Sequence, residues 1–119
     1  MSHTMNIKIE LHDRAALEAA CQRLGLQMVE GKHKLYSSTE EGIAIFLPGW
    51  KYPAIVKADG TVAYDNYNGS WGDMREFHKL EAYYGVEKAK IEARKKGYSV
   101  YEHYNDRTQE IELRIQIGG

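Results

Sequence analysis

The chain has 119 residues, of which 43% are hydrophobic and 28% are charged, and this composition is typical of one folded domain rather than of a disordered segment. Its 16 lysines and arginines are balanced by 17 aspartates and glutamates, so no net field attracts nucleic acid. Cys21 is the only cysteine, which excludes an intramolecular disulfide and a cysteine-based zinc cluster. No apolar stretch is long enough for a membrane span. We therefore expect a single domain over residues 1–119 that works in the cytoplasm.

The first quarter of the sequence predicts a strand and then a helix. Apolar residues occupy every second position over residues 5–11, which is the pattern of a half-buried strand. Asp13 follows as a helix N-cap, and Gly25 stands where a helix would stop. Cys21 falls on the apolar side of this helix, where we expect a buried and unreactive thiol.

The middle of the chain predicts a meander of three or four antiparallel strands. Gly, Pro, Ser and Asp separate short apolar runs at residues 26–29, 35–36, 43–47, 54–56 and 62–64. Asp59 and Gly60, between the last two runs, match a tight hairpin turn because glycine accepts a positive φ.

A long helix follows a polar loop at residues 67–72. Ser70 or Asp73 is the expected N-cap, and Gly97 ends the helix. Two apolar faces run along it, so the helix either bends at Gly85 or is covered on two sides. The first face holds Phe77, Leu80, Tyr84 and Ile91, and the second holds Ala82, Val86, Ala89 and Ala93.

The end of the chain predicts a hairpin, whose last strand at residues 110–117 has one apolar and one polar face. The complete order, β-α-β-β-β-(β)-α-β-β, predicts an α+β fold in which two helices pack on one face of an antiparallel sheet. The expected core residues are Ile7, Ile9, Leu17, Leu24, Ile45, Phe77, Leu80, Ile111, Leu113 and Ile115.

Several segments together suggest a family. They are an MSH start, a strand of the IKIEL kind, a helix ending near LGL, and a closing helix EAYYGVEKAKIEARKKGY before the hairpin. In these features the chain resembles the hypothetical chloroplast open reading frame thirty-five family, found in plastids, cyanobacteria, other bacteria and phages. The resemblance spans nearly the whole chain, although Thr4 stands where members often have an aromatic residue. It implies the fold but no activity, because the family is a domain of unknown function.

The residues that usually carry catalysis form no recognisable pattern. The five histidines contain no HxxxH pair, and the serines lie outside any GxSxG sequence. No glycine pattern matches a phosphate-binding loop. We therefore assign no catalytic residue, no metal ligand and no cofactor, and an enzyme with an unrecognised site ranks third among the functions considered.

Aromatic residues near the polar loop give the better functional signal. These rings either fill the core or line a groove, and in a groove they would suit a peptide, a base or a nucleotide. The first hypothesis is a non-enzymatic interaction module that binds a partner protein. The second is a small-ligand or nucleotide-binding protein, such as a phage protein that sequesters a host factor or signalling nucleotide. The candidate ligand-binding residues are Trp50, Tyr52, Tyr67, Trp71, Arg75 and Lys79.

Self-association is a further expectation. An antiparallel sheet leaves an edge strand open, and the strand at residues 110–117 has no proline to discourage pairing. The second apolar face of the long helix would also suit a neighbour. A homodimer that uses this helix face, a sheet edge or both is the expected assembly.

Overall fold

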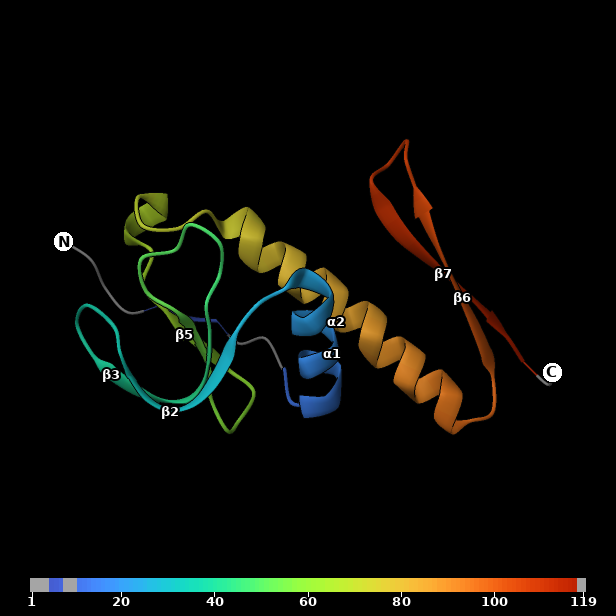
Figure 1. Cartoon of the computed structure of the whole chain (residues 1–119), viewed down its shortest axis with the longest axis horizontal. Coiled ribbons are helices and arrows are strands. Elements are labelled where there is room, and N and C mark those ends of the chain that lie inside the picture. The colour runs from blue at the N-terminus through green and yellow to red at the C-terminus, as the bar shows by residue number, and fades with distance from the viewer. Residues whose placement is uncertain (1–4, 8–10, 118–119) are drawn as a thin grey trace.

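The computed structural model describes residues 5–7 and 11–117, and Figure 1 shows them as a sheet with two helices and a separate hairpin. A five-stranded antiparallel sheet has the strand order β1-β5-β4-β3-β2, and β6 and β7 form the hairpin. The α+β class and the predicted element order are confirmed, including the fourth middle strand. The elements are β1 (Met5–Ile7), α1 (Arg14–Leu24), β2 (Met28–Lys34), β3 (Thr39–Ile45), β4 (Ala54–Val56), β5 (Val62–Tyr64), the 3-10 helix η1 (Tyr67–Gly69), α2 (Met74–Lys95), β6 (Ser99–Asn105) and β7 (Glu110–Gln116).

Local capping residues set the ends of both helices. The Asp13 carboxylate accepts a hydrogen bond from the Ala16 N–H at 3.1 Å, which satisfies one of the free amides of the first turn of α1. Gly25 ends α1 at φ 69°, a left-handed conformation that glycine adopts without steric cost. Asp73, rather than Ser70, caps α2 by accepting from the Arg75 N–H at 2.9 Å.

The main core lies between one face of the sheet and both helices. Leu17 of α1 and Phe77 and Leu80 of α2 are fully buried against sheet residues such as Ile45. These four positions of the predicted core are confirmed. Cys21 is buried in the same core, and this burial raises the pKa of its thiol to about 11. At neutral pH the side chain therefore packs as a small apolar group.

The opposite face of the sheet carries a smaller core. Leu35, Ala44, Ile55 and Ala63 are fully buried there, and Tyr52 packs against them. Of the five short apolar runs in the middle of the chain, the one at residues 35–36 lies outside the strands. The ladder between β2 and β3 runs to the pair of Lys34 and Thr39, so residues 35–38 form the tip of this hairpin.

The β6–β7 hairpin stands away from the five-stranded sheet at the C-terminal end of α2 (Figure 1). The radius of gyration is 15.7 Å, whereas about 13.5 Å is typical for this chain length. The prediction that Ile111, Leu113 and Ile115 of β7 belong to the buried core is wrong. Ile115 is 45% exposed, and Ile111 and Leu113 are only partly buried. Periodicity showed one apolar face but not how much of it the helices cover. Leu24 is partly buried as well, and the side chains of Ile7 and Ile9 lie outside the described residues.

α2 extends unbroken over 22 residues and contacts α1 as well as the hairpin. On the second apolar face of α2, Ala93 is buried. Its carbonyl accepts a hydrogen bond from the Tyr98 N–H at 3.0 Å. Ala82 on the same face is exposed. The helix is therefore covered on two sides only towards its C-terminal end. None of the helices formed by the described residues combines the length and apolar character needed to cross a membrane.

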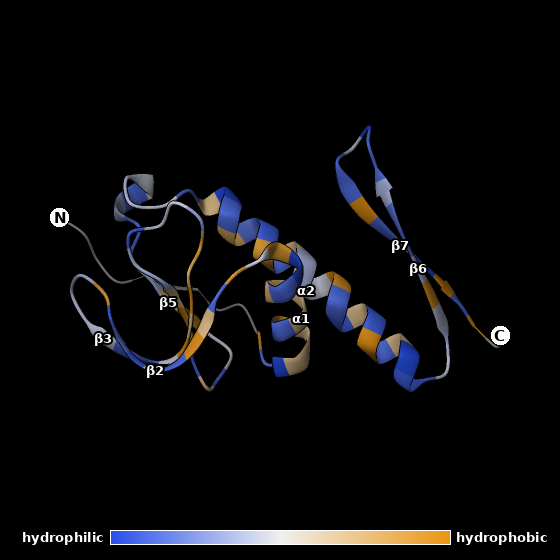
Figure 2. Cartoon of the chain, in the orientation of Figure 1, coloured by the Kyte–Doolittle hydropathy of each residue, from blue (hydrophilic) through white to orange (hydrophobic). Residues whose placement is uncertain are grey.

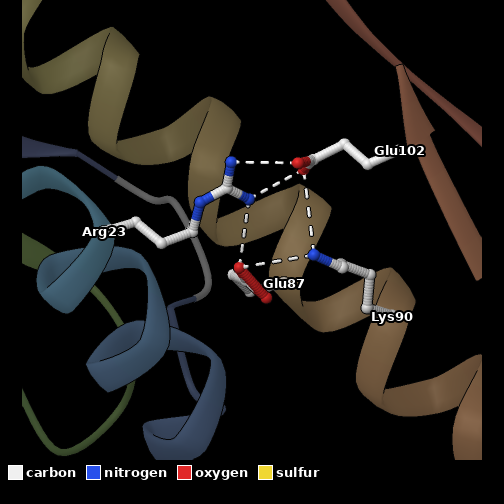
Figure 3. Close-up of polar contacts among 4 residues, drawn as sticks. All are labelled: Arg23, Glu87, Lys90 and Glu102. Atoms are coloured by element: carbon white, nitrogen blue, oxygen red, sulfur yellow. Dashed lines mark hydrogen bonds and ion pairs between the residues drawn. The ribbon is translucent and has the colours of Figure 1, made fainter. Parts of the chain in front are cut away.

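One network of ion pairs joins the hairpin to both helices (Figure 3). The guanidinium of Arg23, at the end of α1, donates to Glu87 of α2 at 3.1 Å and to Glu102 of β6 at 2.7 and 3.1 Å. The Lys90 ammonium lies 3.8 Å from Glu87 and 3.9 Å from Glu102. The hydrogen bond from Arg23 lowers the pKa of the Glu102 carboxyl. Two carboxylates and two cations thus neutralise one another where α1, α2 and β6 meet.

The difference between the two parts of the fold predicts unequal effects of two leucine substitutions. Leu80→Ala should lower the free energy of unfolding by about 2–5 kcal/mol, because Leu80 is fully buried in the main core. Leu113→Ala should cost less than half as much, because its side chain is only partly buried on the hairpin. Urea denaturation of both variants measures this difference. Equal losses would mean that the hairpin belongs to the cooperative core.

Candidate functional site

The predicted aromatic residues come from two loops that lie side by side. Trp50 and Tyr52 belong to the connection between β3 and β4, whereas Tyr67 and Trp71 belong to the connection between β5 and α2. A hydrogen bond from the Lys51 N–H to the Trp71 carbonyl, at 2.8 Å, joins the loops. Because the contact is between backbone groups, it fixes the spacing of the loops independently of their side chains.

Trp71 is the centre of a group of rings. Tyr67 stacks on it with ring centroids 4.8 Å apart, and the rings of Tyr36 and Tyr52 lie at 5.3 and 5.7 Å. We call Tyr36, Tyr52, Tyr67 and Trp71, together with Lys51, the Trp71 cluster. Tyr36 is 56% exposed and Tyr67 is 39% exposed, so two of the rings present large surfaces to solvent.

Lys51 covers part of the central ring. Its ammonium lies 4.5 Å from the centroid of Trp71 and 5.8 Å from that of Tyr52, within the range of a cation–π interaction. The Tyr67 ring and the Lys51 ammonium thus both take up contact surface of this indole. Among the described residues no carboxylate forms an ion pair with Lys51, so its charge is available to a partner.

The loop that carries the cluster has unusual backbone geometry. Tyr67 and Asn68 have φ values of 48° and 51°, in the left-handed region. Asparagine adopts this conformation readily, whereas a tyrosine there is strained. The Tyr67 N–H points to a carboxylate oxygen of Asp65 at 3.4 Å, and Asp65 is only 1% exposed. The residue with this strained backbone is also the one whose ring stacks on Trp71.

Trp50 has a different role from the other predicted rings. It packs against Tyr64 at the edge of the main core, with centroids 5.7 Å apart, and its indole N–H donates to the Asp73 carbonyl at 3.0 Å. A Cβ at Gly72 would lie 2.4 Å from the Trp50 ring, so only glycine allows this contact. Trp50 therefore holds the start of α2 and lies outside the Trp71 cluster.

The two predicted cations lie on the first turns of α2. Arg75 forms hydrogen bonds to the Asp73 carboxylate at 2.6 and 2.9 Å, and this contact lowers the pKa of Asp73. Lys79 is exposed one turn further along. Among the described residues neither cation stacks on a ring of the cluster. The structure therefore brings together Tyr52, Tyr67 and Trp71 but does not join them to Arg75 and Lys79.

Sequence reasoning missed Tyr36 as a member of the cluster and left Lys51 out of the candidate ligand-binding residues. Tyr36 joins the cluster because the seven residue pairs of the β2–β3 ladder carry the hairpin tip to Trp71. No local pattern reveals this contact between residues so far apart in the sequence. Lys51 is flanked by the predicted rings Trp50 and Tyr52, and this neighbourhood was the available signal.

A cavity of about 880 Å³ lies apart from the cluster, between the start of α1, β2, β3 and the turn after β4. Its floor includes Leu17 and Val56, and Arg14 on its rim forms ion pairs with Glu18 and Glu30. The lining carries Arg14 and Lys57 together with Glu30, Glu41 and Asp59, so it has no strong excess of either charge. No group of three potential metal ligands occurs among the described residues.

Comparisons with protein-family models, with curated proteins and with solved structures find no match to this chain. The resemblance to the hypothetical chloroplast open reading frame thirty-five family therefore stays a prediction.

The contact between Lys51 and Trp71 predicts a measurable coupling. Lys51→Gln should lower the free energy of unfolding by about 0.5–1 kcal/mol, the usual contribution of an exposed cation–π pair. In a Trp71→Leu background the same change should cost nearly nothing. Urea denaturation of the four proteins gives the coupling, and Lys79→Gln is the matched control. An equal loss in both backgrounds would contradict the assigned contact.

Proposed function

We propose that this chain is a non-enzymatic interaction module that binds a partner protein through the Trp71 cluster. The observation that carries the proposal is the exposure of Tyr36 and Tyr67 on a group of mutually packed rings. Tyrosine and tryptophan are enriched where proteins bind one another, because they offer large contact areas with few rotatable bonds.

The contacts within the cluster support this proposal in terms of binding entropy. The Tyr36 and Tyr67 rings each lie against Trp71, and the two loops share a backbone hydrogen bond. A surface that is ordered before binding loses less conformational entropy when the complex forms. The strained backbone of Tyr67 is consistent with a position selected for the placement of its ring.

The charge of the surface suggests the chemistry of the partner. Lys51 lies among the rings without a carboxylate partner in the described part of the chain. We propose that the partner contributes apolar side chains to the exposed rings and a carboxylate to Lys51. A nucleotide fits the cluster less well, because Trp71 is already stacked with Tyr67 and in contact with the Lys51 ammonium. The lone buried thiol of Cys21 is compatible with a reducing compartment, and we propose that the module acts in the cytoplasm.

Variants of the exposed rings test the proposal. A partner captured by the wild-type chain is identified, purified and titrated against each variant by calorimetry. Tyr36→Ala and Tyr67→Asn should each weaken binding by about tenfold or more, as for central interface tyrosines. Asparagine at position 67 removes the ring but accepts the left-handed backbone. Lys51→Glu should also weaken binding.

Tyr101→Ala is the matched control, because Tyr101 is 57% exposed on the distant hairpin. It should leave the dissociation constant within about twofold. Equal affinity of the wild type and the Tyr36 and Tyr67 variants would contradict the proposed surface. A tightly bound nucleotide in place of a protein would contradict the proposed class of partner.

A further inference from the structure

The β6–β7 hairpin has an open edge along β7. Within the described residues β7 pairs only with β6, so the backbone groups along its other edge have no strand partner. Its seven residues include neither proline nor glycine. An edge strand of this kind is a template for pairing with another strand unless it is covered.

The two faces of β7 have opposite character. Ile111, Leu113 and Ile115 lie on one face, and Glu112 and Arg114 lie on the other. Figure 2 shows hydrophobic residues on both strands of this hairpin, which is separate from the five-stranded sheet. Ile115 is 45% exposed, so part of the apolar face is in contact with solvent.

Both strands of the hairpin contact α2, but its ion pairs to the helices run through β6. The ion pairs between the hairpin and the helices in the described structure all involve Glu102, which Arg23 and Lys90 contact (Figure 3). Glu112 of β7 instead accepts a hydrogen bond at 2.8 Å from Asn105 within the same hairpin. β6 is thus fixed to the helices, and pairing along the outer edge of β7 requires none of these contacts to break.

We propose that the outer edge of β7 binds β7 of a second copy of this chain, antiparallel, with the two-fold axis at Leu113. In this register Leu113 lies opposite its own equivalent, and Ile111 lies opposite Ile115 of the other copy. Glu112 lies opposite Arg114, and the symmetry forms this pair twice. Cross-strand pairs of opposite charge and of apolar residues both stabilise a sheet. The strand is therefore complementary to itself in charge and in hydrophobicity.

The neighbouring registers are less favourable. Directly opposite residues of an antiparallel pair have their side chains on the same face of the sheet. An axis that passes between two residues would place each Ile or Leu opposite a polar residue. Apolar residues therefore lie opposite one another only when the axis passes through a residue. An axis at Glu112 places two glutamates opposite each other, and an axis at Arg114 does the same with two arginines. An axis at Ile111 pairs Glu110 with Glu112 twice. Of the five axes from Ile111 to Ile115, only the axis at Leu113 forms opposite-charge pairs without a like-charge pair.

The proposed dimer joins two hairpins into a four-stranded sheet. Its apolar face combines Ile111, Leu113 and Ile115 of both copies into one continuous surface. The symmetric arrangement closes both β7 edges, as isologous interfaces do, and leaves β6 as the edge strand on each side of the four-stranded sheet. This inference does not rest on the Trp71 cluster, which belongs to other elements of the fold.

Charge reversal tests the pairing. By light scattering the wild-type chain should have twice its monomer mass of 13.6 kDa. Arg114→Glu places glutamates opposite each other at both charged pairs and should weaken the dimer by about tenfold or more. Glu112→Arg should act likewise, and the double variant Glu112→Arg with Arg114→Glu should restore the dimer. Circular dichroism confirms that each variant is folded.

A cysteine placed on the axis tests the register. Leu113→Cys should form a disulfide-linked dimer on mild oxidation, because directly opposite Cα atoms lie about 4.5–5.5 Å apart. Ile111→Cys is the matched control, since its own equivalent would be displaced by four residues, or about 13 Å. The buried Cys21 does not compete in the folded protein.

Three results would overturn the proposal. The first is a wild-type mass of 13.6 kDa that does not change on concentration. The second is a dimer that both single charge variants leave intact, because that dimer would use another surface. The third is equal cross-linking of the two cysteine variants, which would exclude the axis at Leu113.

Discussion

The position of the β6–β7 hairpin relative to the two helices depends on the contacts of the Arg23 guanidinium. This group donates to Glu87 of α2 and to Glu102 of β6 at the same time, so one side chain links three elements. Arginine suits this position because its planar group offers several donors in a fixed geometry. Glu87 is only 8% exposed, and a carboxylate so buried needs a positive partner. The hairpin is therefore positioned by charge pairing at the middle of β6, and Ile115 on its apolar face stays 45% exposed.

This arrangement separates two surfaces of different character. The Trp71 cluster lies on loops beside the five-stranded sheet, and the hairpin lies at the other end of α2 (Figure 1). A helix of 22 residues spans about 33 Å. A chain that paired through β7 would keep its Trp71 cluster free, and each dimer would then offer two copies of that cluster. Two linked sites raise the apparent affinity for a partner that itself carries two binding sites.

The sequence predicted the features that depend on local chemistry. Asp13 and Gly25 mark the ends of α1 because a cap needs only neighbouring backbone groups. The alternation of apolar and polar residues, together with the turn residues, also predicted the order of the strands along the chain. These patterns did not predict the position of the hairpin, because the alternation of Ile111 and Leu113 describes an apolar face without saying what covers it.

The candidate site was predictable to a similar extent. The rings adjacent in sequence, Tyr67 and Trp71, were recognised, whereas Tyr36 reaches Trp71 only through the length and register of the β2–β3 hairpin. The contact between Arg23 and Glu102 joins residues 79 positions apart. Surface ion pairs of this kind have no sequence signature, because charged residues are abundant and most of them face solvent.

The distance between the hairpin tip and α1 tests most directly whether Arg23 fixes the hairpin. Spin labels on Ala15→Cys and Asp106→Cys, two exposed positions, report this distance by pulsed electron resonance, while the buried Cys21 stays unlabelled. Dilution with unlabelled protein restricts the signal to distances within one chain. At neutral pH the account predicts a narrow distribution for the wild type and for the control Arg14→Gln, and a broad one for Arg23→Gln.

The same measurement has a defined pH dependence. Because Arg23 lowers the pKa of Glu102, the pairing is present above the ordinary glutamate pKa of 4.5 and is lost only as the pH falls through the lowered value. The wild-type distribution should therefore stay narrow at pH 5 and broaden in stronger acid. A distribution that is equally narrow in the wild type and in Arg23→Gln at neutral pH would contradict the account, because the hairpin would then be held by other contacts.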